Sequence, residues 1–240
     1  MKPRMSSGSS TGVPATLSRK AVATVALIGL DEAASAILRD CFKQFGIQTV
    51  AVGEDAGQRL KREKFEACVL RLHEPGAEAL LEAARTSSSN RRIVVYGICS
   101  NAQEALRFSR YGINAVLSDP VERQLALRVV RATHLLVIHE LRRYVRIPIF
   151  TEVVLTEHGR KHAATSLEVS AGGMSLKTRL RAAPPTAVEV EFTLPDSHHL
   201  AVAANVCWQR EPDLLGVRFD AGDKRRLAVK KWIDDYLGLA

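Results

Sequence analysis

Three arginines stand close together past the middle of the chain, and their side chains can bind an anion. Arg142 and Arg146 are four residues apart, and Arg143 lies between them. Residues four apart share one face of a helix, and in an extended strand they also point the same way, so Arg142 and Arg146 can face one partner on either backbone. Guanidinium groups form strong, charge-assisted hydrogen bonds with phosphates. Because Pro148 disfavours helix in the residue before it, we expect a helix arriving here to end between Arg143 and Arg146.

A second polar group follows further along the chain, in the segment Glu168-Val169-Ser170-Ala171-Gly172-Gly173. Neither group establishes a site alone, because an arginine pair at this spacing is also common on solvent-exposed helices. The elements that surround the two groups therefore decide whether they belong to one site.

Length and composition favour two small domains. A chain of 240 residues suits one large domain or, closer to the usual domain size, two smaller ones. Apolar residues make up 46% of the chain, and the formal charge of +8 favours an anionic partner without specifying which one. The four cysteines lack metal-binding spacing, so we expect free thiols in a reducing cytoplasm. No apolar run is long enough to span a bilayer, and we expect a cytoplasmic protein.

The first half of the chain indicates an α/β domain behind a disordered leader. Residues 1–20 are rich in Ser, Thr, Gly and Pro and form the expected leader. Over residues 21–120, short apolar strands alternate with helices, which is typical of a flavodoxin-like domain with a parallel sheet. Helical spacing marks Ala33–Phe45, Glu78–Ala84 and Ala102–Tyr111. The expected strands are Val22–Leu30, Thr49–Val52, Ala67–Leu72, Ile93–Ile98 and Ala115–Leu117.

Several motifs in this half resemble those of response-regulator receiver domains. They include Leu30-Asp31-Glu32 after the first strand and Ser118-Asp119-Pro120 after the fifth. Active receivers accept a phosphoryl group on an aspartate of the third strand, where this sequence has Arg71. Of the acidic pair that holds Mg²⁺ in such domains, only Asp31 remains. The resemblance implies a degenerate receiver-like domain that does not accept phosphate, with Arg71 paired to Asp31 or Asp119.

A long amphipathic helix is expected to link the two halves over residues 121–143. Pro120 and Glu122 suit its first turn. At 1.5 Å per residue it is roughly 35 Å long, more than one small domain covers. Its apolar stripe can pack on the first domain, dock between domains or form the seam of a homodimer. The stripe consists of Leu125, Leu127, Val130, His134, Leu135, Ile138 and Leu141.

The remainder of the chain alternates with a period of two residues, which is typical of antiparallel strands. Six such segments separated by turn residues predict a small β-barrel. A final helix over Lys224–Leu237 can cap one end of the barrel. The expected strands are Ile149–Glu157, Arg160–Val169, Gly173–Thr178, Ala187–Leu194, Leu200–Gln209 and Leu215–Phe219.

Residues 142–240 resemble the PilZ family, and the resemblance joins the two polar groups into one site. The agreements include Arg142-x-x-x-Arg146 before the first strand, x-x-Ser170-x-x-Gly173 at the hairpin between the second and third, and Leu215-Gly216-Val217-Arg218-Phe219. Known PilZ domains commonly bind the bacterial second messenger cyclic di-GMP through the first two motifs. The second motif begins with Asp or Asn in the family, whereas this chain has Glu168.

The residue types suit the ligand that the resemblance implies. An arginine fork meets the O6 and N7 acceptors of guanine and can also clamp a phosphate. The serine hydroxyl can donate to phosphate or base, and the glutamate can accept from guanine N1 and N2. Glycines at 172 and 173 allow positive φ angles in a tight hairpin and a close approach of the ligand to the backbone. The implied ligand site consists of Arg142, Arg146, Glu168, Ser170 and Gly173.

Two functions follow from these features. The first is a bacterial cyclic di-GMP receptor without catalytic activity, in which the ligand changes the arrangement of the domains or the binding of a protein partner. The alternative is a protein-interaction scaffold in which neither the PilZ domain nor the pseudo-receiver binds a small ligand. We expect no cofactor other than that ligand, no metal and no nucleic-acid partner, because the sequence has no metal cluster, helix-turn-helix or catalytic triad at workable spacing.

Overall fold

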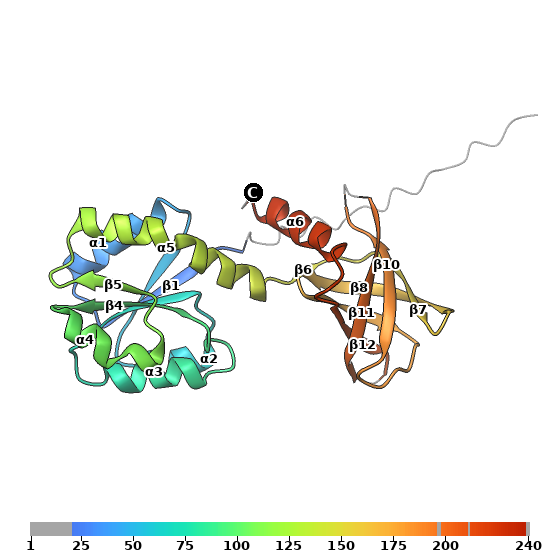
Figure 1. Ribbon diagram of the computed structural model, residues 1–240, viewed down its shortest axis with the longest axis horizontal. Helices are drawn as coiled ribbons and strands as arrows, with labels where there is room; N and C mark the ends of the chain where they lie inside the picture. The colour runs from blue at the N-terminus through green and yellow to red at the C-terminus, as the bar shows by residue number, and fades with distance from the viewer. Residues whose placement is uncertain (1–20, 196–197, 211, 239–240) are drawn as a thin grey trace, which may run out of the picture. The chain divides into compact units, whose positions relative to one another are not determined.

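Two kinds of β-sheet make up the chain, each in a unit of its own. The computed structural model describes residues 21–195, 198–210 and 212–238. One unit spans Val22–Val145, and the other begins at Arg146. Figure 1 shows a parallel sheet with helices in the first unit and an antiparallel barrel in the second. The predicted leader, residues 1–20, lies outside the described residues.

The first unit is built on five parallel strands: β1 (Thr24–Ile28), β2 (Gln48–Val52), β3 (Ala67–Arg71), β4 (Val94–Cys99) and β5 (Ala115–Ser118). Their order in the sheet is β2-β1-β3-β4-β5, which is the flavodoxin-like order. The central strands are continuous apolar runs, and β4 is buried along its whole length. Such runs are expected where helices cover both faces of a parallel sheet. The predicted fold class of this half is therefore confirmed.

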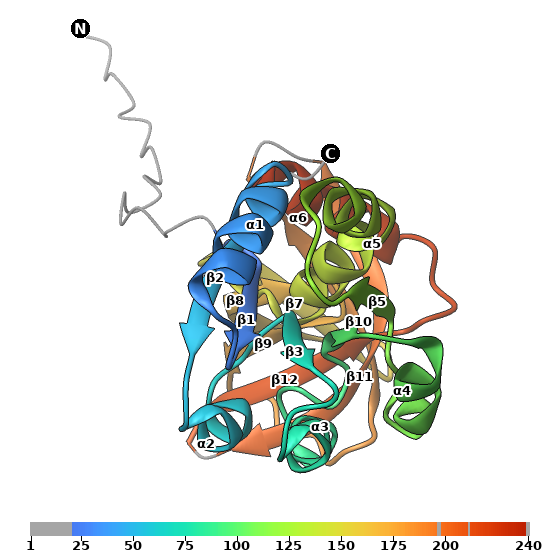
Figure 2. The ribbon, with the colours of Figure 1, turned by 90° about the vertical axis from the view of Figure 1, so that its left-hand side faces the viewer.

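Helices cover both faces of this sheet. Figures 1 and 2 show α1 (Glu32–Lys43) and α5 (Arg123–Tyr144) on one face, and α2 (Ala56–Arg62), α3 (Ala77–Thr86) and α4 (Ala102–Arg107) on the other. A short 3₁₀ helix, η1 (Ser109–Tyr111), follows α4. The sequence did not indicate α2, because only Ala56 and Leu60 of its seven residues are buried. A helix this short shows no usable period. None of the described helices combines the length and apolarity needed to cross a membrane.

The long helix α5 buries only part of its predicted apolar stripe within the first unit. Val130, Ile138 and Leu141 are buried, whereas Leu125 and Leu135 are 42% and 64% exposed. Positions 126, 130, 137 and 141 are buried, and their separations of four, seven and four residues place them in one narrow row along the helix. A hydrogen bond of 2.8 Å between the hydroxyl oxygens of Tyr96 and Thr133 fixes the helix to the sheet.

The second unit is a closed antiparallel barrel of six strands: β7 (Glu152–Glu157), β8 (Arg160–Ser170), β9 (Gly173–Thr178), β10 (Ala187–Thr193), β11 (His199–Arg210) and β12 (Leu214–Phe219). The order β8-β7-β10-β11-β12-β9 closes because β8 also pairs with β9. Alternate side chains fill the interior, where the rings of Phe192 and Phe219 stack 6.2 Å apart. The six predicted strands are confirmed.

Two further elements border the barrel. The two-residue strand β6 (Ile147–Pro148) pairs with β8, and the helix α6 (Arg226–Leu237) lies across one end (Figure 1). Val229, Ile233 and Leu237 face the barrel from α6 and are buried. The indole nitrogen of Trp232 donates to the carbonyl oxygen of Pro195 at 2.9 Å. The predicted capping helix is thus present, and it begins two residues later than expected.

Candidate ligand-binding site on the barrel

The short strand β6 brings Arg146 next to the strand that carries the second motif. Ile147 pairs with Val169 and Pro148 pairs with Glu168. This register places the Nη1 atom of Arg146 3.1 Å from Oε1 of Glu168. Both side chains are exposed, at 57% for the arginine and 37% for the glutamate. The predicted arginine and carboxylate therefore meet at the surface of the barrel.

Ser170 lies on the same face of β8 as Glu168, because residues two apart in a strand point the same way. It is the last residue of β8, where it pairs with Gly173 at the start of β9. Its hydroxyl donates to the carbonyl oxygen of Gly173 at 3.0 Å, which closes the hairpin. The hydroxyl is half-buried and at the edge of the exposed surface. It can reach a ligand if this local bond is exchanged.

The two glycines of the hairpin have a role different from the expected one. We expected positive φ angles at Gly172 and Gly173, but neither glycine has one. Instead, a Cβ built on Gly173 would overlap the carbonyl oxygen of Val217 and lie 3.1 Å from Cα of Arg218 on β12. A Cβ on Gly172 would meet nothing within 4 Å. Gly173 is therefore required by the close approach of β9 to β12.

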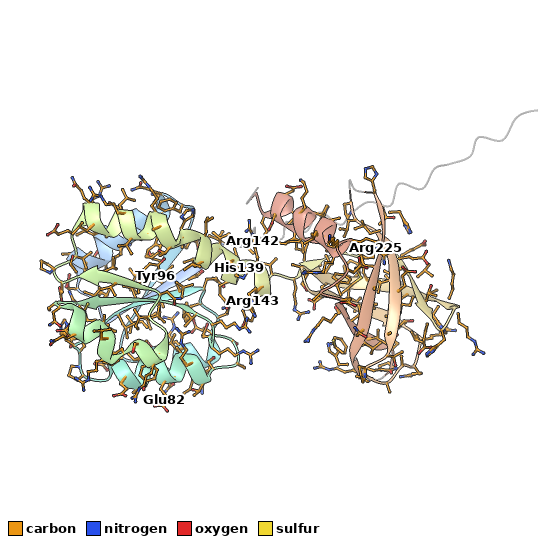
Figure 3. The ribbon with its side chains drawn as sticks, in the orientation of Figure 1. Glu82, Tyr96, His139, Arg142, Arg143 and Arg225 are labelled. Carbon is orange, nitrogen blue, oxygen red and sulfur yellow. The ribbon has the colours of Figure 1, made fainter. Side chains whose placement is uncertain are left out.

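The remaining predicted ligand residue, Arg142, lies in the last turn of α5 and thus in the first unit. Figure 3 shows it with Arg143 and His139 at this end of the helix. As expected from Pro148, the helix ends at Tyr144, and Val145 is its C-cap. The structure thus brings Arg146, Glu168, Ser170 and Gly173 together on the barrel, whereas it places Arg142 on the preceding helix.

In the first unit, Arg71 is the last residue of β3 and lies among carboxylates. Its Nη2 atom donates to Oδ2 of Asp31, and its Nε atom lies 3.2 Å from Oδ2 of Asp119. The prediction named either carboxylate as the partner, and both pair with the arginine. A hydrogen bond from the Ala34 amide, and next the Arg71 guanidinium, hold the pKa of Asp31 below its ordinary value. The cluster joins the ends of three strands, β1, β3 and β5.

Trp208 packs on the wall of the barrel. A Cβ built on Gly216 would overlap the indole ring, so the tryptophan lies directly over this glycine of β12. The guanidinium of Arg210 lies 5.2 Å from the centre of the ring on β11. This position favours a structural role for Trp208.

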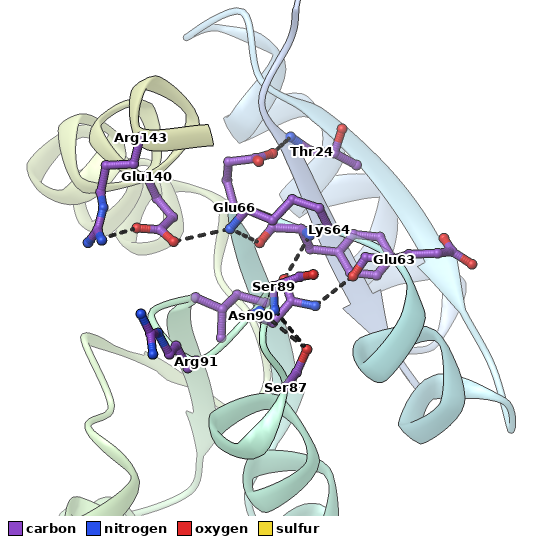
Figure 4. Close-up of polar contacts among 12 residues, drawn as sticks. Thr24, Glu63, Lys64, Glu66, Ser87, Ser89, Asn90, Arg91, Glu140 and Arg143 are labelled. Atoms are coloured by element: carbon purple, nitrogen blue, oxygen red, sulfur yellow. Dashed lines mark hydrogen bonds and ion pairs between the residues drawn. The ribbon is translucent and has the colours of Figure 1, made fainter. Parts of the chain in front are cut away.

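Sequence reasoning missed a buried ion pair at the end of α5 that leads into the arginine motif. Glu140 is 3% exposed, and its carboxylate lies 3.1 Å from Nζ of Lys64 (Figure 4). The position of Glu140 could have indicated its burial, because it follows Val137 by three residues and therefore lies on the same face of the helix. A charged residue on the buried face of a helix needs a partner. The sequence does not say which residue supplies it.

A comparison with known protein families identifies the second half of the chain. Residues 140–237 match the family model of the PilZ domain, so the match begins in α5 and ends with α6. No curated protein matches the chain.

Solved structures resemble each half separately. A CheY-like response regulator receiver domain protein from Methanospirillum hungatei JF-1 is 12% identical, covers 50% of this chain and 97% of its own, and has a TM-score of 0.40. The PilZ domain of CeSA from a cellulose-synthesizing bacterium is 20% identical, covers 40% and 97%, and has a TM-score of 0.33. The inhibitor of motility (MotI/DgrA) of Bacillus subtilis is 17% identical, covers 39% and 49%, and has a TM-score of 0.33.

At these identities, the function of the chain has to be argued from its own residues. The family match, the closed six-stranded barrel and the terminal helix agree with one another. Residues 140–237 form a PilZ domain, and this domain follows a flavodoxin-like, receiver-like α/β unit.

Proposed function

We propose that this protein is a cyclic di-GMP receptor without catalytic activity. The observation that carries the proposal is the shared surface of Arg146, Glu168 and Ser170 on the PilZ barrel. These side chains offer a guanidinium, a carboxylate and a hydroxyl on one exposed face. The guanidinium complements phosphate and the Hoogsteen edge of guanine, and the carboxylate complements the N1 and N2 donors of the same base.

The ligand has to displace an existing ion pair to reach these groups. Arg146 and Glu168 bind each other at 3.1 Å while both remain accessible to solvent. Exposed ion pairs contribute only about 0–1 kcal/mol to stability. Contacts with a doubly charged dinucleotide can therefore compensate for the loss of the pair between Arg146 and Glu168. The glutamate, which stands where the family has Asp or Asn, is long enough to make this pair. We propose that the pair keeps the arginine in place until the ligand arrives.

The proposed site also includes Arg142, which precedes Arg146 by four residues along the chain. Ligand contact with both arginines would order the segment between α5 and β6. Such ordering is a common way for a ligand to change domain arrangement or partner binding. We propose that this segment transmits the signal to a protein partner.

A scaffold that binds no small ligand is the second candidate. It is favoured by the internal partners of the site, since Glu168 pairs with Arg146 and the Ser170 hydroxyl bonds to Gly173. The replacement of the receiver aspartate by Arg71 points the same way. In this case both units would retain their folds for protein contacts alone.

Isothermal titration of the full chain with cyclic di-GMP tests the proposal. We expect saturable binding, and we expect Arg146→Ala to weaken it by roughly 10- to 100-fold, because one good arginine–base contact contributes about 1–3 kcal/mol. Arg160→Ala is the matched control, since Arg160 is an exposed arginine at the opposite end of β8. Absence of binding by the wild-type chain would leave the scaffold as the better account, and equal affinity in the two variants would remove Arg146 from the site.

A further inference from the structure

The last turn of α5 is held by a carboxylate that is almost completely buried. The Glu140 side chain is only 4% exposed, and its carboxylate forms an ion pair. Burial of a lone charge is strongly unfavourable, and breaking a buried pair by removing one partner is correspondingly destabilising. The geometry of this turn therefore depends on the cation that pairs with Glu140.

Lys64 supplies this cation and contacts the turn at two places. Its Nζ atom lies 3.1 Å from Oε1 of Glu140 and 4.0 Å from the centre of the Tyr144 ring. A third contact, to the carbonyl oxygen of Phe65, is also 3.1 Å long. Ion pair and cation–π contact thus hold residues 140 and 144, on either side of the two arginines.

The loop that carries Lys64 is itself fixed. The side chain of Asn90 is completely buried and accepts the backbone N–H of Phe65 at 3.0 Å. It also donates to the carbonyl oxygens of Leu60 and Glu63, at 2.7 and 2.6 Å. Figure 4 shows Asn90 bonded to Glu63, next to Lys64 in the loop before β3. A rigid loop can hold a side chain in one position against α5.

We infer that Lys64 is a positioning residue for Arg142 in the cyclic di-GMP site, an inference that rests on the proposed function. Lys64 and Glu140 form an anchor that keeps residues 140–144 helical, and Arg142 lies in the middle of this turn. The second carboxylate oxygen of Glu140 also lies 3.8 Å from Nη1 of Arg143. Because Lys64 pairs with Glu140, the guanidinium of Arg143 is not the only cation that neutralises this carboxylate.

Loss of the anchor is expected to lower the affinity for cyclic di-GMP without removing any ligand contact. Without Lys64, the Glu140 carboxylate turns toward the arginines of its own helix, and the turn loses its fixed backbone. Ordering the backbone of one residue on binding lowers affinity by about tenfold. We expect a deficit of about this size in Lys64→Met.

The experiment is a double-mutant cycle in the full chain, read by titration with cyclic di-GMP. Lys64→Met is expected to weaken binding about tenfold in the wild-type background and less than about twofold in Arg142→Ala, because the anchor acts through Arg142. Lys61→Met is the matched control, since Lys61 is an exposed lysine on α2. Lys64→Arg keeps the cation and is expected to restore most of the affinity.

Each result bears on the inference separately from the proposed function. Failure of the wild-type chain to bind would overturn both. Normal wild-type binding with equal affinities of Lys64→Met and Lys61→Met would overturn only the role of Lys64. The role of Lys64 would also be overturned if Lys64→Met weakened binding equally in the wild-type and Arg142→Ala backgrounds. That result would indicate general destabilisation. If Lys64→Met does not fold, Glu140→Gln breaks the ion pair without leaving a buried charge, and it has to show the same dependence on Arg142.

Discussion

Arg71 is the centre of an ion-pair cluster at one edge of the parallel sheet. The guanidinium binds Asp31 at the end of β1 and Asp119 after β5, so it joins strands that lie on either side of β3 and β4. Both carboxylates are therefore paired with one guanidinium of the same unit.

This cluster predicts a pH-dependent contribution to the stability of the first unit. The pKa of Asp31 lies below its ordinary value of 3.8, first because of the Ala34 amide and then because of Arg71. A lowered pKa means that stabilisation is present above pH 3.8 and is lost as the pH falls through the native pKa. We expect Arg71→Met to lower the free energy of unfolding at neutral pH and to approach the wild type in acid. Denaturant unfolding followed by far-UV circular dichroism measures the difference, and a difference that is constant with pH would contradict it.

Residue types alone predicted the candidate site residues, but they did not predict which residues these side chains contact within the protein. The sequence predicted that Arg71 would pair with an aspartate, and it does. It gave no sign that Glu168 reaches Arg146, because that contact depends on the register of a two-residue strand, β6. Glu140 was missed for a similar reason, since its cation comes from a loop 76 positions away in the sequence.

At the scale of elements, the β8–β9 hairpin connects the candidate site to the barrel. Ser170 closes this hairpin, and Gly173 allows β9 to approach β12. The motif that marks the candidate site is therefore also a packing motif. A substitution at Gly173 is expected to disturb the packing of the barrel.

Gly173→Ala is expected to destabilise the second unit by about 1–3 kcal/mol, because the new methyl group meets backbone atoms of β12 that cannot rotate away. Gly172→Ala is the control, since its Cβ has open space and its φ is not positive, and we expect a change within about 0.5 kcal/mol. Both tryptophans of the chain, Trp208 and Trp232, lie in this unit, so their fluorescence reports its unfolding in denaturant. Equal stability of Gly173→Ala and Gly172→Ala would show that β9 and β12 can move apart to accept the methyl group, and it would contradict the packing role of Gly173.

Element prediction succeeded where the periodic pattern was long and failed where it was short. Alternation over β8 and β11, each with more than ten residues, predicted the barrel strands. The seven residues of α2 carry too few buried positions to show a helical period. For α5 the helix and its apolar stripe were predicted, but what covers the stripe was left open, and the structure leaves Leu125 and Leu135 exposed.

At the scale of the whole molecule, the chain joins two units with different polar clusters. In the first unit, Asp31 and Asp119 are both paired with Arg71. The PilZ unit keeps an arginine, a carboxylate and a hydroxyl at its surface. The end of α5 that Lys64 and Glu140 anchor leads directly into the segment of Arg142 and Arg146, and under the proposed function the first unit would act on ligand binding through this segment.

The site itself is tested most directly by backbone amide chemical shifts of the full chain during titration with cyclic di-GMP. We predict that the largest changes appear at Arg142–Pro148 and Glu168–Gly173, with little change at the far hairpin around His158 and Gly159. Saturating ligand that leaves these amides unchanged, or shifts only residues around Arg71, would contradict the proposed ligand site.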